Sequence, residues 1–335
     1  MKKTKKLLAC LIAAATMFTM GSTAFAAEAG ATTPTYTDKS TVTIKKAYKL
    51  TNAGTKSPEE TFTLVQDGDG TVKDSEATSV PKLGTIMGAK FAEGAAAATV
   101  DGTTGNITVA LPTYEHVGIY TYTLKEVNNN TAGVTYYEND IKLVVTVIND
   151  GNGKLRVAAV HTEGEGEGKN DTFTNTYSAG KLNVTKEVTG NLGDKNKKFD
   201  FAVTFKKPEG KNVKSTITAT IAGAKDDNFA LNWDENGECK YTFKLAHKET
   251  ATFDNLPYGV TYTVTETATD GYTTTKKGET GSVAAAEQTA AFTNNKTGEV
   301  DTGVNLTTLP YILVFAGVIV IAGAAFITRR RKFED

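Results

Sequence analysis

Residues 118–126 read GIYTYTLKE, and their alternation decides the fold class. Tyr120, Tyr122 and Leu124 occupy every second position, with threonine or lysine after each of them. Successive side chains of a β-strand point to opposite faces of the sheet, so this alternation predicts a strand with one buried face. Glu126 falls on the same side as the two tyrosines, which places a carboxyl group against an apolar interior.

Similar runs, rich in Thr, Val, Tyr and Phe and separated by Gly, Asn and Asp, recur through the middle of the chain. They read VTIKKAYKL (42–50), ETFTLVQD (60–67), DIKLVVTVI (140–148), FDFAVTF (199–205) and VTYTVTET (260–267). Such runs are typical of antiparallel β-sandwiches, and 335 residues are enough for two domains of ordinary size. The chain is therefore predicted to be all-β. A short helix is the alternative for GTIMGAKFAEGAAAA, residues 84–98.

The chain uses one plan twice. In each copy a lysine follows two alternating apolar residues, a glutamate ends GIYTYTLKE or GVTYTVTE, and an asparagine closes the triplet Phe-Thr-Asn. These residues are Lys46, Glu126 and Asn175 in the first copy and Lys186, Glu266 and Asn294 in the second. The lysine and the glutamate are 80 residues apart in both copies. Strand parity turns all six side chains inward, and parity also favours Lys46 over its neighbour Lys45.

A buried lysine, glutamate and asparagine can form a covalent bond between themselves. Burial disfavours the charged forms, which leaves a neutral amine and a protonated carboxyl group. The amine attacks the side-chain carbonyl of asparagine, the glutamate polarises that carbonyl and moves protons, and ammonia leaves. The product is a Lys–Asn isopeptide bond, formed once per molecule. In the alternative interpretation the strand ends reach the rim of the sandwich, where water solvates these side chains.

The first 26 residues have the features of a secretory signal peptide. Four lysines precede an apolar stretch, and the small-residue pattern Ala24-Phe25-Ala26 follows, so cleavage is predicted after Ala26. The alternative is a lipoprotein signal at Cys10, but only three residues separate Cys10 from Lys6, which is too few for an apolar core.

The C-terminal part of the chain predicts a membrane anchor. Residues 309–327 carry no charge and are long enough to cross a bilayer as one helix. The basic residues Arg329 to Lys332 follow, within the tail 328–335, so the positive-inside rule keeps this end in the cytoplasm. The body of the protein is then extracellular.

Residues 299–303 read EVDTG and come shortly before this apolar span. An Asp-Thr-Gly triplet also carries half of the carboxylate pair of aspartic proteases, but the chain has no second one. The order of polar segment, EVDTG, apolar span and basic tail resembles the cell-wall sorting signal of Gram-positive surface proteins. That resemblance implies that a sortase cleaves between Thr302 and Gly303. A plain membrane anchor is the alternative.

Charge and cysteine content exclude several classes of function. After cleavage at both ends, the chain from Ala27 to Thr302 holds 29 Lys and Arg against 36 Asp and Glu, a formal charge of about −7. This charge argues against a nucleic-acid partner. Cys239 remains as a single cysteine, so no internal disulfide forms, and we expect it to be an inert strand residue. Three histidines and one thiol do not support a metal site, and no cofactor is expected.

Taken together, these motifs resemble the two-domain major pilins of Gram-positive cocci, of the T-antigen type whose sorting signal reads EVPTG. The match runs from about Thr41 to Gly303, with Asp301 in place of the proline. The resemblance implies two immunoglobulin-like, CnaB-type sandwiches, here residues 38–178 and 179–297. It also implies isopeptide bonds between the first and last strands of each, Lys46–Asn175 assisted by Glu126 and Lys186–Asn294 assisted by Glu266.

In such pilins a sortase joins the threonine of one subunit to a lysine of the next. By that resemblance the linking lysine lies near the end of the first domain, where Lys169 stands in the acidic, glycine-rich segment EGEGEGKNDTFTN. Lys181 and Lys154 are the alternatives.

The resulting hypothesis is a structural protein, the shaft subunit of a sortase-assembled pilus attached to the cell wall. Its expected partners are pilin-type and housekeeping sortases, identical subunits, ancillary pilins, peptidoglycan and host surface ligands. The second hypothesis is an ancillary pilin or a single wall-anchored adhesin on the same scaffold. An enzyme acting on another substrate is the third, and no catalytic set besides the two self-linking triads supports it.

Overall fold

The computed structural model describes residues 38–150, 153–164, 166, 168–226 and 229–299, and this part of the chain is all-β. The predicted signal peptide, most of the EVDTG motif, the apolar span 309–327 and the basic tail lie outside the described residues. The described residues contain no helix that is long and apolar enough to cross a membrane. The alternative helix at residues 84–98 is wrong, because two short strands, β4 and β5, form there instead.

Strands β1 to β11 form a first unit. They are β1 (Thr41–Leu50), β2 (Glu60–Phe62), β3 (Leu64–Lys73), β4 (Ile86–Met87), β5 (Ala89–Phe91), β6 (Thr103–Ala110), β7 (Gly118–Glu126), β8 (Val134–Thr135), β9 (Ile141–Asn149), β10 (Leu155–Glu163) and β11 (Thr172–Tyr177). One sheet has the order β4-β6-β1-β11-β8, the other has the order β10-β9-β7-β3, and β2 pairs with β5. Within the first sheet β1 is antiparallel to β6 and parallel to β11.

Strands β12 to β21 form a second unit. They are β12 (Ala179–Thr189), β13 (Phe199–Lys206), β14 (Thr218–Ile221), β15 (Ala224–Lys225), β16 (Glu238–Leu245), β17 (Thr250–Pro257), β18 (Thr261–Glu266), β19 (Thr273–Lys277), β20 (Thr280–Ser282) and β21 (Glu287–Asn295). The sheets have the orders β15-β14-β17-β12-β21-β19 and β16-β13-β18-β20. The first strand β12 again lies parallel to the last strand β21, as β1 does to β11.

Alternation fixes which side chains enter the core of each unit. Every second residue of β7 is buried from Gly118 to Leu124, and the same period runs along β12. The buried side chains of both sheets of the first unit form one apolar cluster, and those of the second unit form another. Each fully buried Val, Leu or Phe contributes roughly 1.5–3 kcal/mol to folding, so a one-residue slip of a strand would be strongly unfavourable.

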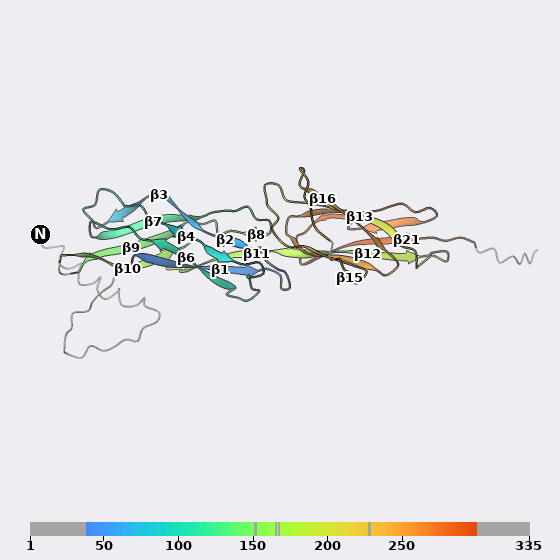
Figure 1. The fold of residues 1–335 in the computed structure, drawn as a ribbon, viewed down its shortest axis with the longest axis horizontal. Coiled ribbons are helices and arrows are strands. Elements are labelled where there is room, and N and C mark those ends of the chain that lie inside the picture. Colours follow the sequence, from blue (N-terminus) through green and yellow to red (C-terminus); the bar gives the residue numbers. More distant parts are fainter. Residues whose placement is uncertain (1–37, 151–152, 165, 167, 227–228, 300–335) are drawn as a thin grey trace, which may run out of the picture.

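The two units follow one another along the long axis of the molecule (Figure 1). Only Ser178 separates β11 from β12, so the last strand of the first unit continues almost directly into the first strand of the second. Side-chain contacts support this junction. The amide of Asn255 donates to the backbone oxygen of Lys56 and accepts from its backbone N–H, both at 2.9 Å.

Candidate functional site

The first triad joins three strands of the first unit. Lys46 of β1 donates from Nζ to Oε2 of Glu126 at 2.5 Å and to Oδ1 of Asn175 at 2.7 Å. Asn175 of β11 donates from Nδ2 to the other carboxylate oxygen of Glu126, also at 2.5 Å. The three polar groups therefore form a closed triangle. Lys46 and Asn175 are fully buried, and the side chain of Glu126 has no exposed surface.

The second triad occupies the equivalent place in the second unit. Lys186 of β12 donates from Nζ to both carboxylate oxygens of Glu266 at 2.8 Å. Asn294 of β21 donates from Nδ2 to Oε1 of Glu266 at 2.5 Å. The Oδ1 atom of Asn294 is buried and has no hydrogen-bond partner within the described residues. The carbonyl that the amine would attack is therefore left open, whereas in the first triad the lysine already contacts it.

Parallel pairing explains why each lysine reaches its asparagine. In register, Lys46 lies beside Phe173 and Tyr48 lies beside Asn175, so the lysine and the asparagine are offset by two residues along the strands. The same offset recurs in the second unit, where Lys186 lies beside Phe292 and Val188 beside Asn294. Two strand residues span about 6.6 Å, which the four-carbon stem of lysine can cover. The glutamate comes from the facing sheet in both units.

Aromatic rings surround both amines. Lys46 Nζ lies 5.4 Å from the ring centre of Phe62 and 5.9 Å from that of Tyr137. Lys186 Nζ lies 4.3 Å from the ring centre of Phe199. Burial lowers the pKa of Lys46 below 10.5, against the opposing charge and hydrogen bond of Glu126. Burial likewise lowers the pKa of Lys186, against its hydrogen bond and attraction to Glu266.

An ion pair buried so completely gains little, because removing two charges from water offsets most of their attraction. Transferring one proton from the ammonium to the carboxylate leaves a neutral amine and a neutral acid, which an apolar site tolerates better. A neutral amine beside an amide carbonyl and a carboxylic acid is the arrangement that amide exchange requires. The geometry is therefore suited to a Lys–Asn bond in each unit.

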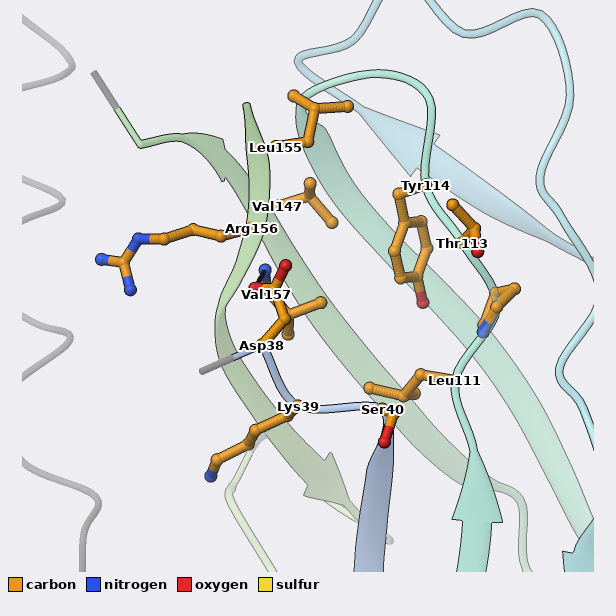
Figure 2. A pocket seen from close by; sticks show the side chains of 11 residues that line it. Asp38, Lys39, Ser40, Leu111, Thr113, Tyr114, Val147, Leu155, Arg156 and Val157 are labelled. Atoms are coloured by element: carbon orange, nitrogen blue, oxygen red, sulfur yellow. Dashed lines mark hydrogen bonds between the residues drawn. The ribbon is translucent and has the colours of Figure 1, made fainter. Parts of the chain in front are cut away.

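The triads lie apart from the pocket at the start of the first unit. A pocket of about 210 Å³ opens beside the start of β1, and its lining includes Asp38, Leu111, Tyr114 and Arg156 but none of the six triad residues (Figure 2). The triad side chains are sealed inside the two cores instead. The three side chains of each triad therefore contact one another and are closed off from solvent.

The lysines predicted for links between subunits lie at the surface. Lys169 is exposed, between β10 and β11, and forms an isolated antiparallel bridge with Glu163. Of the alternatives, Lys181 on β12 pairs with Glu287 at 3.2 Å, and Lys154 is exposed beside the start of β10. Thr302 and Gly303 lie outside the described residues.

Glu60 is a third buried carboxylate that the sequence prediction did not include. It is 3% exposed and heads the alternation Glu60, Phe62, Leu64, so strand parity could have identified it. Cys239 lies on β16 as a buried free thiol, and burial raises its pKa. No group of three or more potential metal ligands occurs in the described part of the chain.

Comparison with known proteins adds family relationships to this geometry. Residues 42–178 match the family model described as a Spy0128-like isopeptide containing domain, and residues 180–296 match a domain of unknown function, DUF7601. The pilin of Streptococcus pyogenes serotype M1 is 26% identical over 313 residues, 87% of this chain and 91% of its own length. The pilus tip adhesin Cpa of S. pyogenes is 30% identical over 123 residues, 35% of this chain and 17% of the adhesin.

A solved structure supports the fold. The crystal structure of the major pilin from S. pyogenes covers 78% of this chain and all of its own, with a TM-score of 0.51 and 24% sequence identity. The two all-β units thus follow a pilin-like arrangement. Residues 42–178 belong to the Spy0128-like isopeptide-containing domain family, and the chain as a whole is a relative of the major pilins of Gram-positive bacteria.

Proposed function

We propose that this chain is the shaft subunit of a sortase-polymerised pilus anchored to the cell wall, and that a Lys–Asn isopeptide bond stabilises each of its two units. In this proposal residues 38–178 and 179–297 are two immunoglobulin-like, CnaB-type domains. The observation that carries the proposal is the recurrence of one buried Lys, Glu and Asn arrangement at the same place in both units.

Bond formation follows from the contacts of the first triad. Lys46 passes a proton to Glu126 and becomes a neutral amine. Its nitrogen attacks Cγ of Asn175, while the protonated Glu126, which contacts Nδ2 in the structure, turns its proton toward the carbonyl oxygen to polarise it. Glu126 then moves the proton of the attacking nitrogen to the leaving amide nitrogen, and the C–N bond breaks. One amide bond is gained, one is lost, and one ammonia leaves.

The second triad supports the same steps with Lys186, Glu266 and Asn294. The hydrogen bonds of its lysine go to the carboxylate, so the amine must turn toward the unpartnered Oδ1 of Asn294 before it reacts. Asn294 already donates from Nδ2 to Glu266. The nitrogen that leaves as ammonia therefore lies beside the carboxyl group that supplies its proton.

Assembly uses the two ends of the chain. The signal peptide 1–26 directs secretion, and the span 309–327 with the tail 328–335 holds the precursor in the membrane. A sortase cleaves between Thr302 and Gly303 and transfers Thr302 to the amine of Lys169 on another copy. A housekeeping sortase then attaches the fibre to peptidoglycan, with ancillary pilins and host surface ligands as further partners. Exposure of Lys169 supports this role.

The intact mass of the chain from Ala27 to Thr302, produced without a sortase, tests the cross-links. We expect a deficit of two ammonia masses, with peptide mapping that joins Lys46 to Asn175 and Lys186 to Asn294. A deficit of one ammonia mass would limit isopeptide formation to one unit. The full unmodified mass in folded protein would remove the isopeptide mechanism.

An ancillary pilin or a wall-anchored adhesin is the second candidate, favoured by the partial match to a pilus tip adhesin. The two roles differ in cell-wall extracts. A shaft subunit gives a ladder of covalent multimers of itself, whereas an adhesin appears as one band or joined to a different pilin.

A further inference from the structure

A short segment of the second unit contacts the first unit at successive positions. We call residues 212–216, between β13 and β14, the junction strap. The backbone N–H of Asn212 donates to the oxygen of Asn130 at 2.8 Å, and the N–H of Ala132 donates to the oxygen of Asn212 at 2.9 Å. Further along the strap, the hydroxyl of Ser215 lies 2.6 Å from that of Tyr177. At the end of the strap, Thr216 lies close enough to the Glu93 carboxyl group to lower its pKa.

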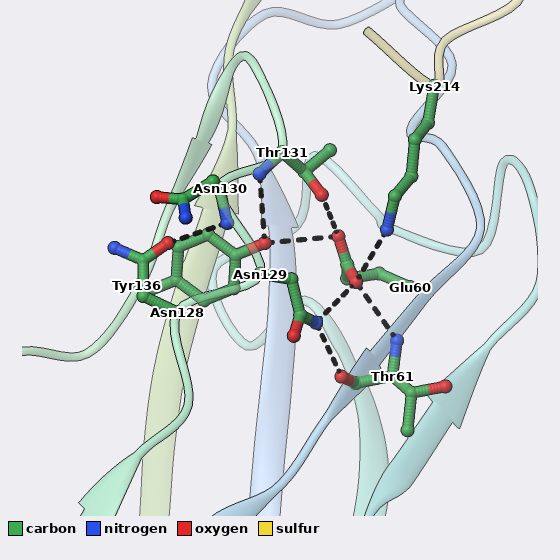
Figure 3. A network of polar contacts seen from close by, with 8 residues as sticks. All are labelled: Glu60, Thr61, Asn128, Asn129, Asn130, Thr131, Tyr136 and Lys214. Carbon is green, nitrogen blue, oxygen red and sulfur yellow. Dashed lines mark hydrogen bonds and ion pairs between the residues drawn. The ribbon is translucent and has the colours of Figure 1, made fainter. Parts of the chain in front are cut away.

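Glu60 is the anchor for the middle of the strap. Its side chain is 1% exposed. The carboxylate accepts hydrogen bonds from first-unit donors, namely Thr131 Oγ1 at 2.5 Å, Asn129 Nδ2 at 2.7 Å, Tyr136 OH at 3.1 Å and Thr61 N at 3.3 Å. One more donor comes from the second unit, since Lys214 Nζ lies 3.3 Å from Oε1 (Figure 3).

The neutral donors hold Glu60 in place but leave its negative charge unbalanced. Lys214 supplies the opposite charge, and it does so only when the second unit sits where the structure has it. A buried charge that loses its partner is strongly unfavourable, so separation of the units at this point would be resisted. The side chain of Lys214 is 42% exposed and so lacks the burial that favours a neutral amine, unlike the sealed side chain of Lys46. The contact is therefore an ion pair and not a third site of amide formation.

We propose that Glu60 and the junction strap form a latch that holds the two units in one fixed orientation. The latch makes the chain a rigid rod across its own junction. This inference goes beyond the proposed function and does not depend on cross-linking or on polymerisation, because all its contacts lie within one chain.

Residual dipolar couplings of the chain from Ala27 to Thr302 test the latch. Couplings from the two units should fit one common alignment tensor when the junction is rigid. In Lys214→Met, which keeps the length of the stem and removes the charge, we expect the two tensors to differ in magnitude. Lys206→Met is the matched control, because Lys206 pairs with Glu238 at the same 3.3 Å but within the second unit. It should leave one common tensor.

Two further results bear on the proposal. Glu60→Gln, which keeps the size and one accepting oxygen but removes the charge, should uncouple the tensors as Lys214→Met does, with the fold of both units retained in their amide spectra. A common tensor in both variants would overturn the latch. A deficit of one water mass, mapped to Lys214 and Glu60, would also overturn it, because the junction would then be covalent.

Discussion

At the scale of single residues, the two buried lysines are the nucleophiles of the proposed cross-links. Lys46 and Lys186 are 0% and 2% exposed, and each contacts a glutamate whose side chain is also sealed from solvent. Lysine is rarely buried this completely unless its side chain is paired with an opposite charge. Burial in the apolar cores keeps water from each amine and favours the neutral form that can act as a nucleophile.

The lowered pKa of Lys46 predicts a pH-dependent stability in a variant that cannot react. In Asn175→Ala, Lys46 stays a free amine. Between its lowered pKa and the ordinary value of 10.5, the folded state binds fewer protons than the unfolded state. The unfolding free energy of the first unit should therefore rise with pH through that window. Urea unfolding at increasing pH measures this slope.

The control for this experiment is the double variant Asn175→Ala with Lys46→Met, which has no amine to titrate. Its stability should lack the rise. Equal slopes in the single and double variants would show that Lys46 has an ordinary pKa in the folded state.

Removal of one carboxyl group should abolish one bond. In Glu126→Gln the side chain keeps its size but can no longer accept and return a proton, so we expect the mass deficit to fall from two ammonia to one. The first unit should also lose roughly 4–5 kcal/mol of stability, by analogy with a disulfide that closes a loop of comparable size. Intact mass and chemical unfolding measure the two effects. Glu115→Gln, at an exposed position, should change neither of them.

At the scale of elements, the parallel pairing of first and last strands decides where a cross-link acts. β1 and β11 lie side by side in the first unit, and β12 and β21 do so in the second. β21 is the last strand before the EVDTG segment, so a pull on the C-terminus reaches β21 first. A bond from Asn294 to Lys186 would transfer that load to the centrally placed β12 without relying on sheet hydrogen bonds.

Hydrogen–deuterium exchange of the backbone amides of β21 tests whether the bond restrains this strand. In Asn294→Ala, which cannot form the bond, backbone amides of β21 should exchange faster with deuterium, because the strand is then held by hydrogen bonds and packing alone. Asn295→Ala is the matched control, since Asn295 is the exposed neighbour on the same strand. Equal protection in both variants, measured by mass spectrometry, would show that no bond restrains β21.

At the scale of the whole molecule, the chain is two units in line, joined by an almost uninterrupted passage from β11 to β12. The proposed fibre adds a covalent link from Thr302 of one copy to Lys169 of the next. Tension then enters at Lys169, follows β11 into β12, and leaves through β21 to the C-terminus.

Substitution of the linking lysine tests the assembly. In Lys169→Arg the side chain keeps its charge but cannot form an amide with a threonine carbonyl, so the covalent ladder in cell-wall extracts should disappear. Lys181→Arg and Lys154→Arg should leave the ladder intact. A persistent ladder in Lys169→Arg, together with its loss in one of the other two variants, would move the link to that lysine.

Much of this protein follows from its sequence alone. Period-two alternation determines the strands and turns Lys46, Glu126 and Asn175 inward, because a one-residue shift would expose an entire apolar face. The second copy of the pattern places Lys186, Glu266 and Asn294 in the same order along the chain. Pattern was insufficient at residues 84–98, where the alanines suit a short helix but sheet pairing takes two short strands.

Only the tertiary structure decided how these residues meet. Parallel pairing with a two-residue offset, and a facing sheet that brings the glutamate, set every distance in the triads. The asymmetry between them, with a free carbonyl on Asn294 alone, has no signal in the sequence. The contact of Glu60 with Lys214 likewise joins residues far apart in the chain. Strand parity is a local property and can be read along the chain, whereas register between strands and contact between units depend on packing of the whole fold.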